Sequence, residues 1–200
     1  MMVKICGITN LEDAAAAVEG GAGALGFNFY PPSPRSILPE DAARIAAQAP
    51  PGVLRVGVFV NEAPARIEEI ARIAGLDVAQ LHGDETPGVY PKGLPVWKAL
   101  RVDATFTPAL LDVPAEAVLL DGPAGLLYGG AGEAFDWNLA RGLGRRIVIA
   151  GGLDASNVRA AIECARPWGV DACSRLESAP GRKDHTKLAA FLRAALETPC

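Results

Sequence analysis

Short runs of β-branched and apolar residues alternate with alanine-rich segments along almost the whole chain. Eight runs have the length and composition of strands, and 200 residues shared among eight repeats give about 25 residues for each strand and its connection. Strict alternation of strands and helices is the pattern of a parallel sheet covered by helices. The candidate strands lie at residues 3–6, 24–29, 54–60, 78–82, 96–102, 117–121, 146–150 and 169–173.

Five of the segments between these strands have the composition and length of helices. They lie at residues 11–19, 39–48, 63–73, 155–165 and 186–196, and the connections after the fourth and fifth strands are shorter. Thr9 with Glu12 predicts a capping box, and Asn61, Asp154 and Asp184 are candidate helix caps.

Eight strand–helix repeats are the number that closes a (β/α)8 barrel. We therefore predict an α/β protein with one barrel domain over residues 1–200. A doubly wound open sheet is the main alternative, because counting repeats can miss or add a strand. Gly21, Gly23 and Gly26 have the spacing of a dinucleotide-binding loop, but they precede a strand, so we interpret them as a helix-ending turn with Gly26 allowing close packing.

Composition narrows the possible functions. A formal charge of −4 disfavours binding to nucleic acid through a basic surface. We expect no membrane segment and a cytoplasmic protein, because no apolar run approaches the length that spans a bilayer and the N-terminus lacks an export pattern. The four scattered cysteines form no Cys-x-x-Cys pair, and with only two histidines we expect neither a disulfide scaffold nor a metal site.

The carboxyl ends of the candidate strands carry the residues suited to chemistry. In a parallel barrel these ends surround one pocket, which would bring together Cys6, His82, Asp121 and the Gly151-Gly152 turn. The loops after the seventh and eighth strands commonly bind phosphate, and here they hold that glycine pair and Ser174 with its neighbours. Arg175, Arg182 and Lys183 add positive charge nearby.

The ordered set of motifs in this chain resembles the phosphoribosylanthranilate isomerase family over nearly its whole length. The motifs are Lys-Ile-Cys-Gly-Ile-Thr (4–9), Gly-Phe (26–27), Phe-Tyr (29–30), Ser-Pro-Arg-Ser (33–36), Val-Gly-Val-Phe-Val (56–60), Gln-Leu-His-Gly-Asp (80–84), Leu-Asp (120–121), Gly-Gly (129–130), Phe-Asp-Trp (135–137), Ala-Gly-Gly-Leu (150–153), Glu-Ser-Ala-Pro-Gly (177–181) and Lys-Asp (183–184).

The resemblance implies a (β/α)8 barrel that carries out an Amadori rearrangement of phosphoribosylanthranilate in tryptophan biosynthesis, without a cofactor. It implies that Cys6 is the general base, which must be a thiolate, and that Asp121 is the general acid. Arg35 would pair with or stack on the anthranilate group. Gly151, Gly152, Asp171, Ser174 and Arg175 complete the expected substrate-binding set, and a monomer and a homodimer are both open.

The chain departs from the family after the eighth strand. The family usually reads Ser-Ser-Gly-Val-Glu there, whereas this chain reads Cys-Ser-Arg-Leu-Glu at 173–177. Arg175 in place of glycine would reshape a phosphate loop, although its charge partly compensates. A related phosphosugar isomerase, including one that accepts the histidine-pathway aminoaldose, and a weakened barrel that only binds a phosphorylated ligand therefore stay as alternatives.

Strand parity predicts a polar layer beneath the pocket. Lys4 shares a face with Cys6, Asp171 shares a face with Cys173, and strands one and eight are neighbours in a closed barrel. We therefore expect Lys4 to pair with Asp171, with Gln80 and Lys98 as further members of the layer. Asn28, an amide where strand two should be apolar, is another candidate, and His82 is expected to be structural.

Overall fold

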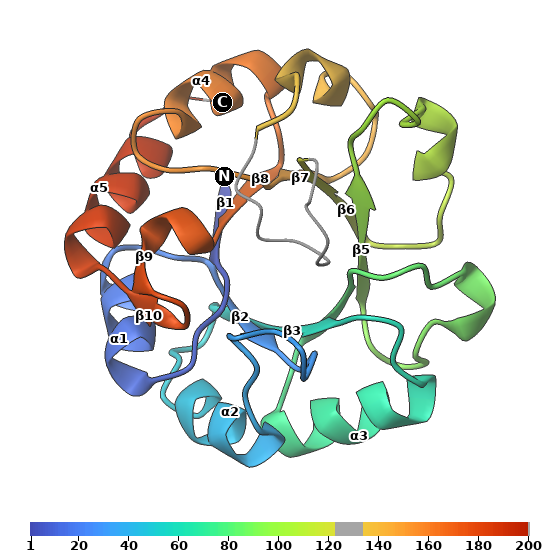
Figure 1. Ribbon diagram of the computed structural model, residues 1–200, viewed down its shortest axis with the longest axis vertical. Helices are drawn as coiled ribbons and strands as arrows, with labels where there is room; N and C mark the ends of the chain where they lie inside the picture. Colours follow the sequence, from blue (N-terminus) through green and yellow to red (C-terminus); the bar gives the residue numbers. More distant parts are fainter. Residues whose placement is uncertain (123–133, 200) are drawn as a thin grey trace.

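The computed structural model describes residues 1–122 and 134–199 and contains a closed barrel of eight parallel strands in the order β1 to β8. Figure 1 looks down the barrel, with the strands in a ring and the helices outside it. The barrel, and not the open sheet, is the fold. The strands are β1 Met2–Ile5, β2 Ala24–Asn28, β3 Leu54–Phe59, β4 Val78–Leu81, β5 Val96–Arg101, β6 Ala117–Asp121, β7 Ile147–Ile149 and β8 Gly169–Ala172.

Five α-helices cover the barrel among the described residues, at the places that the sequence pattern predicts. They are α1 Leu11–Glu19, α2 Pro39–Ala46, α3 Pro64–Ala74, α4 Val158–Ala165 and α5 His185–Leu196. After β4 and β5 the chain forms only short 3-10 turns, η1 Pro87–Val89 and η2 Pro108–Leu111, which confirms that these connections are shorter. Two further turns, η3 Trp137–Ala140 and η4 Ser174–Leu176, follow β6 and β8.

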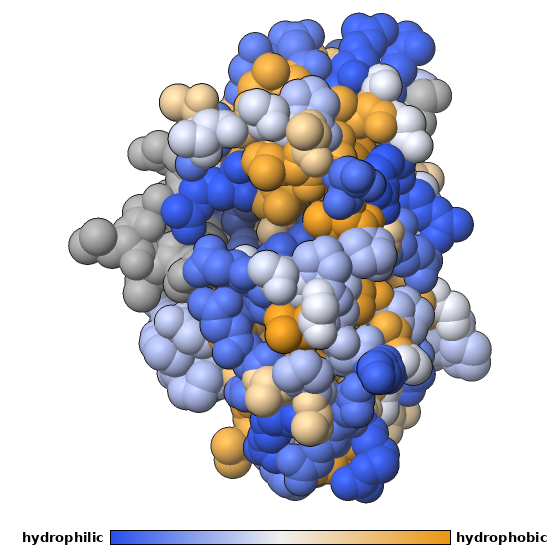
Figure 2. Space-filling view, turned by 90° about the vertical axis from the view of Figure 1, so that its right-hand side faces the viewer, coloured by the Kyte–Doolittle hydropathy of each residue, from blue (hydrophilic) through white to orange (hydrophobic). Residues whose placement is uncertain are grey.

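On the side of the barrel that carries η1 and η2, short 3-10 turns stand where α-helices cover the other strands. Val89 in η1 and Leu110 in η2 are exposed apolar residues. Figure 2, which faces the side drawn at the right of Figure 1, shows hydrophobic residues at the surface in patches separated by hydrophilic ones. No helix in residues 1–122 or 134–199 is both long and apolar enough to cross a bilayer.

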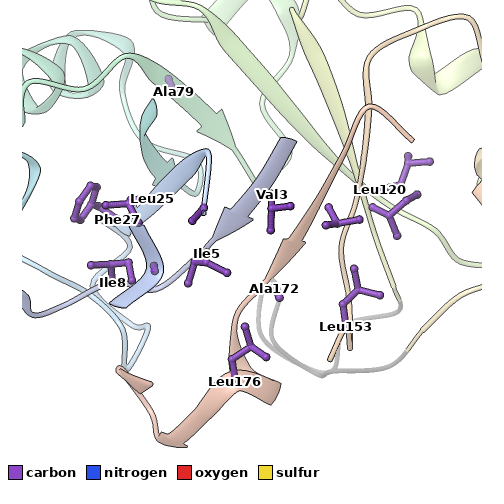
Figure 3. Close-up of a cluster of buried hydrophobic side chains, with 14 of the residues drawn as sticks. Val3, Ile5, Ile8, Leu25, Phe27, Ala79, Leu120, Leu153, Ala172 and Leu176 are labelled. Atoms are coloured by element: carbon purple, nitrogen blue, oxygen red, sulfur yellow. The ribbon is translucent and has the colours of Figure 1, made fainter. Parts of the chain in front are cut away.

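Side chains along each strand alternate between the barrel interior and the layer under the helices. The interior at the end of the barrel away from the carboxyl ends of the strands is apolar and contains Ala24, Val56, Val78, Trp97 and Ala117. A second apolar cluster, Ala99, Leu119, Val148 and Ala150, extends towards the carboxyl ends of the strands. The larger apolar cluster lies between strands and helices, and Figure 3 shows part of it, with Val3 and Ile5 of β1 near Leu25 of β2 and Ala172 of β8.

Helix caps test the local predictions. Asp184 is confirmed as the cap of α5, since its carboxylate accepts the amide hydrogens of Thr186 and Lys187. Thr9 is not the cap of α1: Asn10 is, because its side chain accepts from Asp13 N, while the Thr9 hydroxyl donates to Gly181 O in a distant loop.

Two other candidate caps are also wrong. Asn61 accepts from Asp84 N and so joins two loops, and α3 begins instead at Pro64, whose fixed φ suits the first helical turn. Asp154 accepts from Ser156 N in the turn before α4, and the cap position of α4 is Asn157.

Pairing of β1 with β8 closes the barrel. Lys4 lies opposite Asp171 and Ile5 lies opposite Ala172, so the first and last strands bring residues far apart in sequence into contact. A small antiparallel hairpin of β9 Glu177–Ala179 and β10 Arg182–Lys183 follows β8 and was not predicted. Lys183 N donates to the buried carboxylate of Asp13, which joins the hairpin to α1.

Lys98 does not join the interior polar layer, and that prediction is wrong. Its strand neighbour Leu81 faces outward, whereas Gln80 lines the interior, so the Lys98 side chain points to the outer layer. There its ammonium donates to Glu85 Oε2 at 2.8 Å and to Gly83 O at 2.6 Å. Glu85 in turn accepts from Asn61 N at 2.7 Å, so this buried pair holds the loop after β4.

Replacing Lys98 by methionine tests this assignment. Lys98→Met removes the ion-pair partner of the buried Glu85 carboxylate, and breaking such a pair costs about 3–5 kcal/mol, so we expect a clearly lower urea midpoint of unfolding. Arg66→Met is the matched control, because Arg66 pairs with Glu69 on an exposed helix surface, and it should leave the midpoint nearly unchanged. Equal small shifts in both variants would contradict a structural role for Lys98.

Candidate active site

A pocket of about 750 Å³, including its open mouth, lies at the carboxyl ends of the strands. It brings together every site residue that the sequence predicts. Its lining combines two thiols, two carboxyl groups, two guanidinium groups and a glycine pair. The lining residues are Cys6, Asn28, Ser33, Arg35, Val58, Val60, Gln80, His82, Asp121, Ala150, Gly151, Gly152, Leu153, Asp171, Ala172, Cys173, Ser174 and Arg175.

A buried ion pair forms the floor beneath Cys6, as strand parity predicts. Lys4 Nζ lies 2.9 Å from Asp171 Oδ2, and the Lys4 side chain has no solvent exposure. A Cβ placed on Gly26 would come within 2.9 Å of Cys6 Sγ and 3.0 Å of Lys4 Nζ, so the thiol and the ammonium are neighbours across this glycine. Gly26 therefore serves close packing, as its position in the sequence indicates.

The surroundings of Cys6 favour its thiolate form. A hydrogen bond from the Cys173 thiol lowers the pKa of Cys6, burial opposes this, and the positive charge of Lys4 lowers it further, so that the net direction is well below the usual thiol range. Burial of Lys4 favours its neutral form, but the charges of Asp171 and Cys6 outweigh burial and raise the pKa of Lys4. The sequence-based expectation of a thiolate is consistent with this geometry.

Asp171 has a carboxyl group that titrates near neutrality. Burial raises its pKa to about 7, although the ammonium of Lys4 acts in the opposite direction. Its second oxygen, Oδ1, and the side-chain oxygen of Gln80 are both buried, and neither has a hydrogen-bond partner among the described residues. Two buried acceptors that line a pocket are suited to hydroxyl groups of a ligand.

Asp121 ends β6 at the pocket and contacts His82. His82 Nε2 lies 3.1 Å from Asp121 Oδ2, and Gln80 Nε2 lies 3.3 Å from His82 Nδ1. Because the side-chain nitrogen of Gln80 can only donate, the matching tautomer of His82 accepts at Nδ1 and carries its ring hydrogen on Nε2, which donates to Asp121. The histidine thus orients the carboxyl group of Asp121, a contact that the separate positions in the sequence do not show.

Arg35 reaches the pocket from the loop after β2 and is held by a carboxylate that the sequence did not single out. Its Nε and Nη2 donate to the two oxygens of Glu177 at 2.9 and 2.7 Å, in a bidentate pair. Lys183 Nζ also donates to Glu177, at 3.1 Å. Burial raises the pKa of Glu177, but its contacts with Arg35 and Lys183 outweigh burial and lower it.

Gly7 allows Arg35 to pass close to the end of β1. Gly7 has a φ of +73°, and a Cβ there would lie 2.9 Å from both Arg35 Cδ and Cys173 Sγ. Any side chain would therefore collide with two pocket residues and strain the backbone. Asn28, the unexpected amide in β2, supports the same loop: it accepts from Tyr30 N at 2.8 Å and donates to Ser33 Oγ at 3.2 Å.

The loops after β7 and β8 lie side by side at the pocket. Gly151 and Gly152 have φ values of +84° and +63°, which an L side chain rarely adopts. Arg175 in η4 contacts Asp154 in the β7 loop, with Nη1 3.3 Å from Oδ2, and so joins the two loops. Lys183, another nearby cation, is a buried residue of the hairpin strand β10, where its ammonium pairs with Glu177, and it does not line the pocket.

The comparisons with known proteins agree with this geometry. The family model described as N-(5'-phosphoribosyl)anthranilate (PRA) isomerase matches residues 3–194. This chain belongs to the PRA isomerase family. The PRA isomerase of Solibacter usitatus is 64% identical over 196 residues, which cover 98% of this chain and 97% of that protein. The PRA isomerase of Trichlorobacter lovleyi is 50% identical over 200 residues and covers 98% of each.

Solved structures of PRA isomerases have the same fold. The enzyme from Thermus thermophilus aligns over 100% of both chains with a TM-score of 0.92 and 40% identity. The enzyme from Thermotoga maritima aligns over 98% of both chains with a TM-score of 0.89 and 44% identity. A third structure, 42% identical with a TM-score of 0.86 over 98% of both chains, is a PRA isomerase in complex with reduced 1-(o-carboxyphenylamino)-1-deoxyribulose 5-phosphate.

The departures from the usual PRA isomerase pattern lie next to the pocket. Cys173, in place of serine, lines the pocket with Cys6, and Arg175, in place of glycine, contacts Asp154. Of the motifs that carry the resemblance, Gly129-Gly130 lies outside the described residues. In residues 1–122 and 134–199, no group of three or more histidine, cysteine, aspartate or glutamate residues is placed to hold a metal ion.

The role of Lys4 beside Cys6 gives a testable prediction. In Lys4→Met the thiolate of Cys6 loses a neighbouring positive charge, so the pKa of Cys6 should rise. The pH at which iodoacetamide alkylates Cys6 at half its maximal rate should move upward, by about one pH unit or more for the loss of a close buried charge. Lys92→Met, which removes an exposed lysine near η1, should leave that profile unchanged, and an unshifted profile in Lys4→Met would contradict the role.

Proposed function

We propose that this chain converts N-(5'-phosphoribosyl)anthranilate into 1-(o-carboxyphenylamino)-1-deoxyribulose 5-phosphate, a step of tryptophan biosynthesis. The observation that carries the proposal is one pocket in which a thiol with a lowered pKa, Cys6, and a carboxyl group, Asp121, face a common space. Membership of the PRA isomerase family and a relative of 64% identity support the same reaction.

The reaction needs one acid and one base. Asp121 donates a proton to the ring oxygen of the ribose, and the ring opens to a Schiff base. The thiolate of Cys6 then removes the proton from C2, which gives an enolamine, and tautomerisation gives the ketone. The His82 contact orients Asp121, while Lys4 and Cys173 keep Cys6 ready to accept a proton. No cofactor takes part in these steps.

In this proposal the substrate contacts three parts of the pocket. Arg35 binds the anthranilate carboxylate through Nη1, because its Nε and Nη2 are engaged by Glu177. Asp171 accepts a sugar hydroxyl through Oδ1. The phosphate binds between the loops after β7 and β8, with the backbone of the glycine pair on one side and residues of η4 on the other. The phosphate site thus comprises Gly151, Gly152, Ser174 and Arg175.

We also propose a single barrel domain over residues 1–200 that acts in the cytoplasm as a monomer or a homodimer. One solved relative is described as mutually generated monomers of a dimeric PRA isomerase from Thermotoga maritima, which supports both assemblies as states of this fold. The phosphorylated small molecule is the only partner that this function requires. Light scattering on the purified chain distinguishes the two assemblies.

The reaction and both roles can be tested in one assay. Purified parent protein should consume freshly generated phosphoribosylanthranilate, followed by the loss of its fluorescence. Cys6→Ser and Asp121→Asn should each lower kcat by about 10²- to 10⁴-fold, the usual contribution of a general base or acid. Cys164→Ser is the matched control, because this thiol lies on α4 away from the pocket and its loss should leave the rate unchanged.

A folded but inactive parent would overturn the proposed function. Turnover of the histidine-pathway aminoaldose in its place would favour the related phosphosugar isomerase. Binding of a phosphorylated ligand without Cys6-dependent turnover would favour a barrel that only binds.

Arg175 provides a separate test of the phosphate site. Arg175→Gly restores the usual family residue but removes a partly exposed positive charge, so KM should rise about two- to fivefold, with kcat nearly constant. Arg182→Ala removes an exposed arginine from the hairpin and should change neither constant. A lower kcat with unchanged KM in Arg175→Gly would show that the residue does not act through phosphate binding.

A further inference from the structure

Two thiols meet at the point where the barrel closes. Ile5 lies opposite Ala172, and Cys6 N donates to Ala172 O at 2.9 Å, so Cys6 and Cys173 are the next pair along the two strands. Both side chains line the pocket, so the two thiols face the same space. Neighbouring strands are about 4.7–4.9 Å apart, within the Cα separation of about 4.4–6.8 Å that a disulfide spans.

The two thiols differ in reactivity. Cys6 has a lowered pKa, because Cys173 donates a hydrogen bond to it and Lys4 places a positive charge beside it. Cys173 is held as the neutral thiol, because the neighbouring Cys6 thiolate and burial both raise the pKa of Cys173. A thiolate is the form that attacks a hydroperoxide, and both sulfur atoms face a pocket that a small oxidant can enter.

Oxidation of Cys6 changes the environment of Cys173. A neutral sulfenic acid at Cys6 no longer accepts the Cys173 proton as a thiolate does. The influences that lower the pKa of Cys173 stay in place, since Lys183 Nζ lies 3.8 Å from Cys173 Sγ and Arg35 adds a second positive charge. Cys173 is therefore placed and charged to attack the oxidised sulfur of Cys6.

We propose that Cys6 and Cys173 form a hydroperoxide-sensitive pair that closes to a reversible disulfide in the active site. The Cys6 thiolate attacks the outer oxygen of the peroxide, and the O–O bond breaks, which leaves a sulfenic acid on Cys6. The departing hydroxide or alkoxide takes a proton from solvent and leaves as water or an alcohol. The Cys173 sulfur then attacks the Cys6 sulfur, the S–O bond breaks, and a second water leaves. Overall, two thiols are oxidised to one disulfide and one peroxide is reduced.

The consequence for activity rests on the proposed function. A sulfur atom in a disulfide cannot accept a proton from C2 of the substrate, so the oxidised protein has lost its base. Cys173 departs from the usual family pattern, which has serine at this position, and serine cannot form the second bond. Reduction by a dithiol restores both groups.

Peptide mapping tests the disulfide without reference to activity. The full chain is treated with hydrogen peroxide, alkylated with iodoacetamide under denaturing conditions and digested. We expect a linked peptide that joins Cys6 to Cys173, lighter by two hydrogen atoms than the two separate peptides, and its loss after dithiothreitol. Cys164→Ser should give the same linked peptide, because Cys164 lies on α4 beside Asn138.

Cys173→Ser should give no linked peptide, and Cys6 should instead accumulate sulfenic, sulfinic and sulfonic acid forms that dithiothreitol only partly reverses. Alkylatable thiols at both positions in peroxide-treated parent, or a link between other cysteines, would overturn the proposal. A linked peptide in a protein inactive before oxidation would instead overturn the proposed function alone.

Discussion

An ammonium group with no access to water lies inside the barrel, and the site is organised around its neutralisation. Lys4 is surrounded by an interior that is otherwise apolar on its lower side, so its charge requires close negative partners. Asp171 supplies one at 2.9 Å and the thiolate of Cys6 supplies another. A buried ion pair is weak evidence for stability by itself. Here the same charge also helps to lower the pKa of Cys6, the base that we propose.

The barrel interior divides into two parts with different tasks. The lower part is filled by Trp97 and small or branched side chains, which pack without polar groups. The upper part contains acids, bases and amides, each placed by a different strand end. Glu177 lies in β9 of the hairpin, outside the eight barrel strands, and it contacts both Arg35 and Lys183. Its contacts therefore position these hairpin and loop side chains as firmly as the barrel strands position theirs. Because these side chains are already ordered, ligand binding loses less conformational entropy.

Most of the fold could be predicted from the sequence, because hydrophobic periodicity and turn residues are local signals. All eight strands and five helices lie where predicted, and parity correctly paired Lys4 with Asp171, since neighbouring strands and a shared face were enough to decide it. The same reasoning was wrong for Lys98. Whether its side chain faces the barrel interior depends on the register between β4 and β5, which no local pattern gives. Thr9 was wrongly predicted as a helix cap, because its hydroxyl donates to the carbonyl of Gly181, more than a hundred residues later in the sequence.

The sequence predicted which residues line the pocket but not the contacts that they make there. The resemblance supplied the predicted roles of Cys6, Asp121 and Arg35, and their meeting in one pocket follows from the barrel. The contact of His82 with Asp121, the hold of Glu177 on Arg35 and the adjacency of Cys173 to Cys6 all join different strands or loops. Such contacts depend on three-dimensional register, and one sequence has no covarying partner to reveal them.

Closure by β1 and β8 has a consequence for how the protein matures. During synthesis, which begins at the N-terminus, Cys6 is made almost at once. Asp171, Cys173 and Lys183 follow only after most of the barrel sequence has been made. Contacts between such distant segments form late and slowly in folding. Until then Cys6 keeps the ordinary, weakly ionised thiol of an unfolded chain. The lowered pKa of Cys6 therefore arises only in the folded barrel, and in the nascent chain this thiol has only ordinary reactivity.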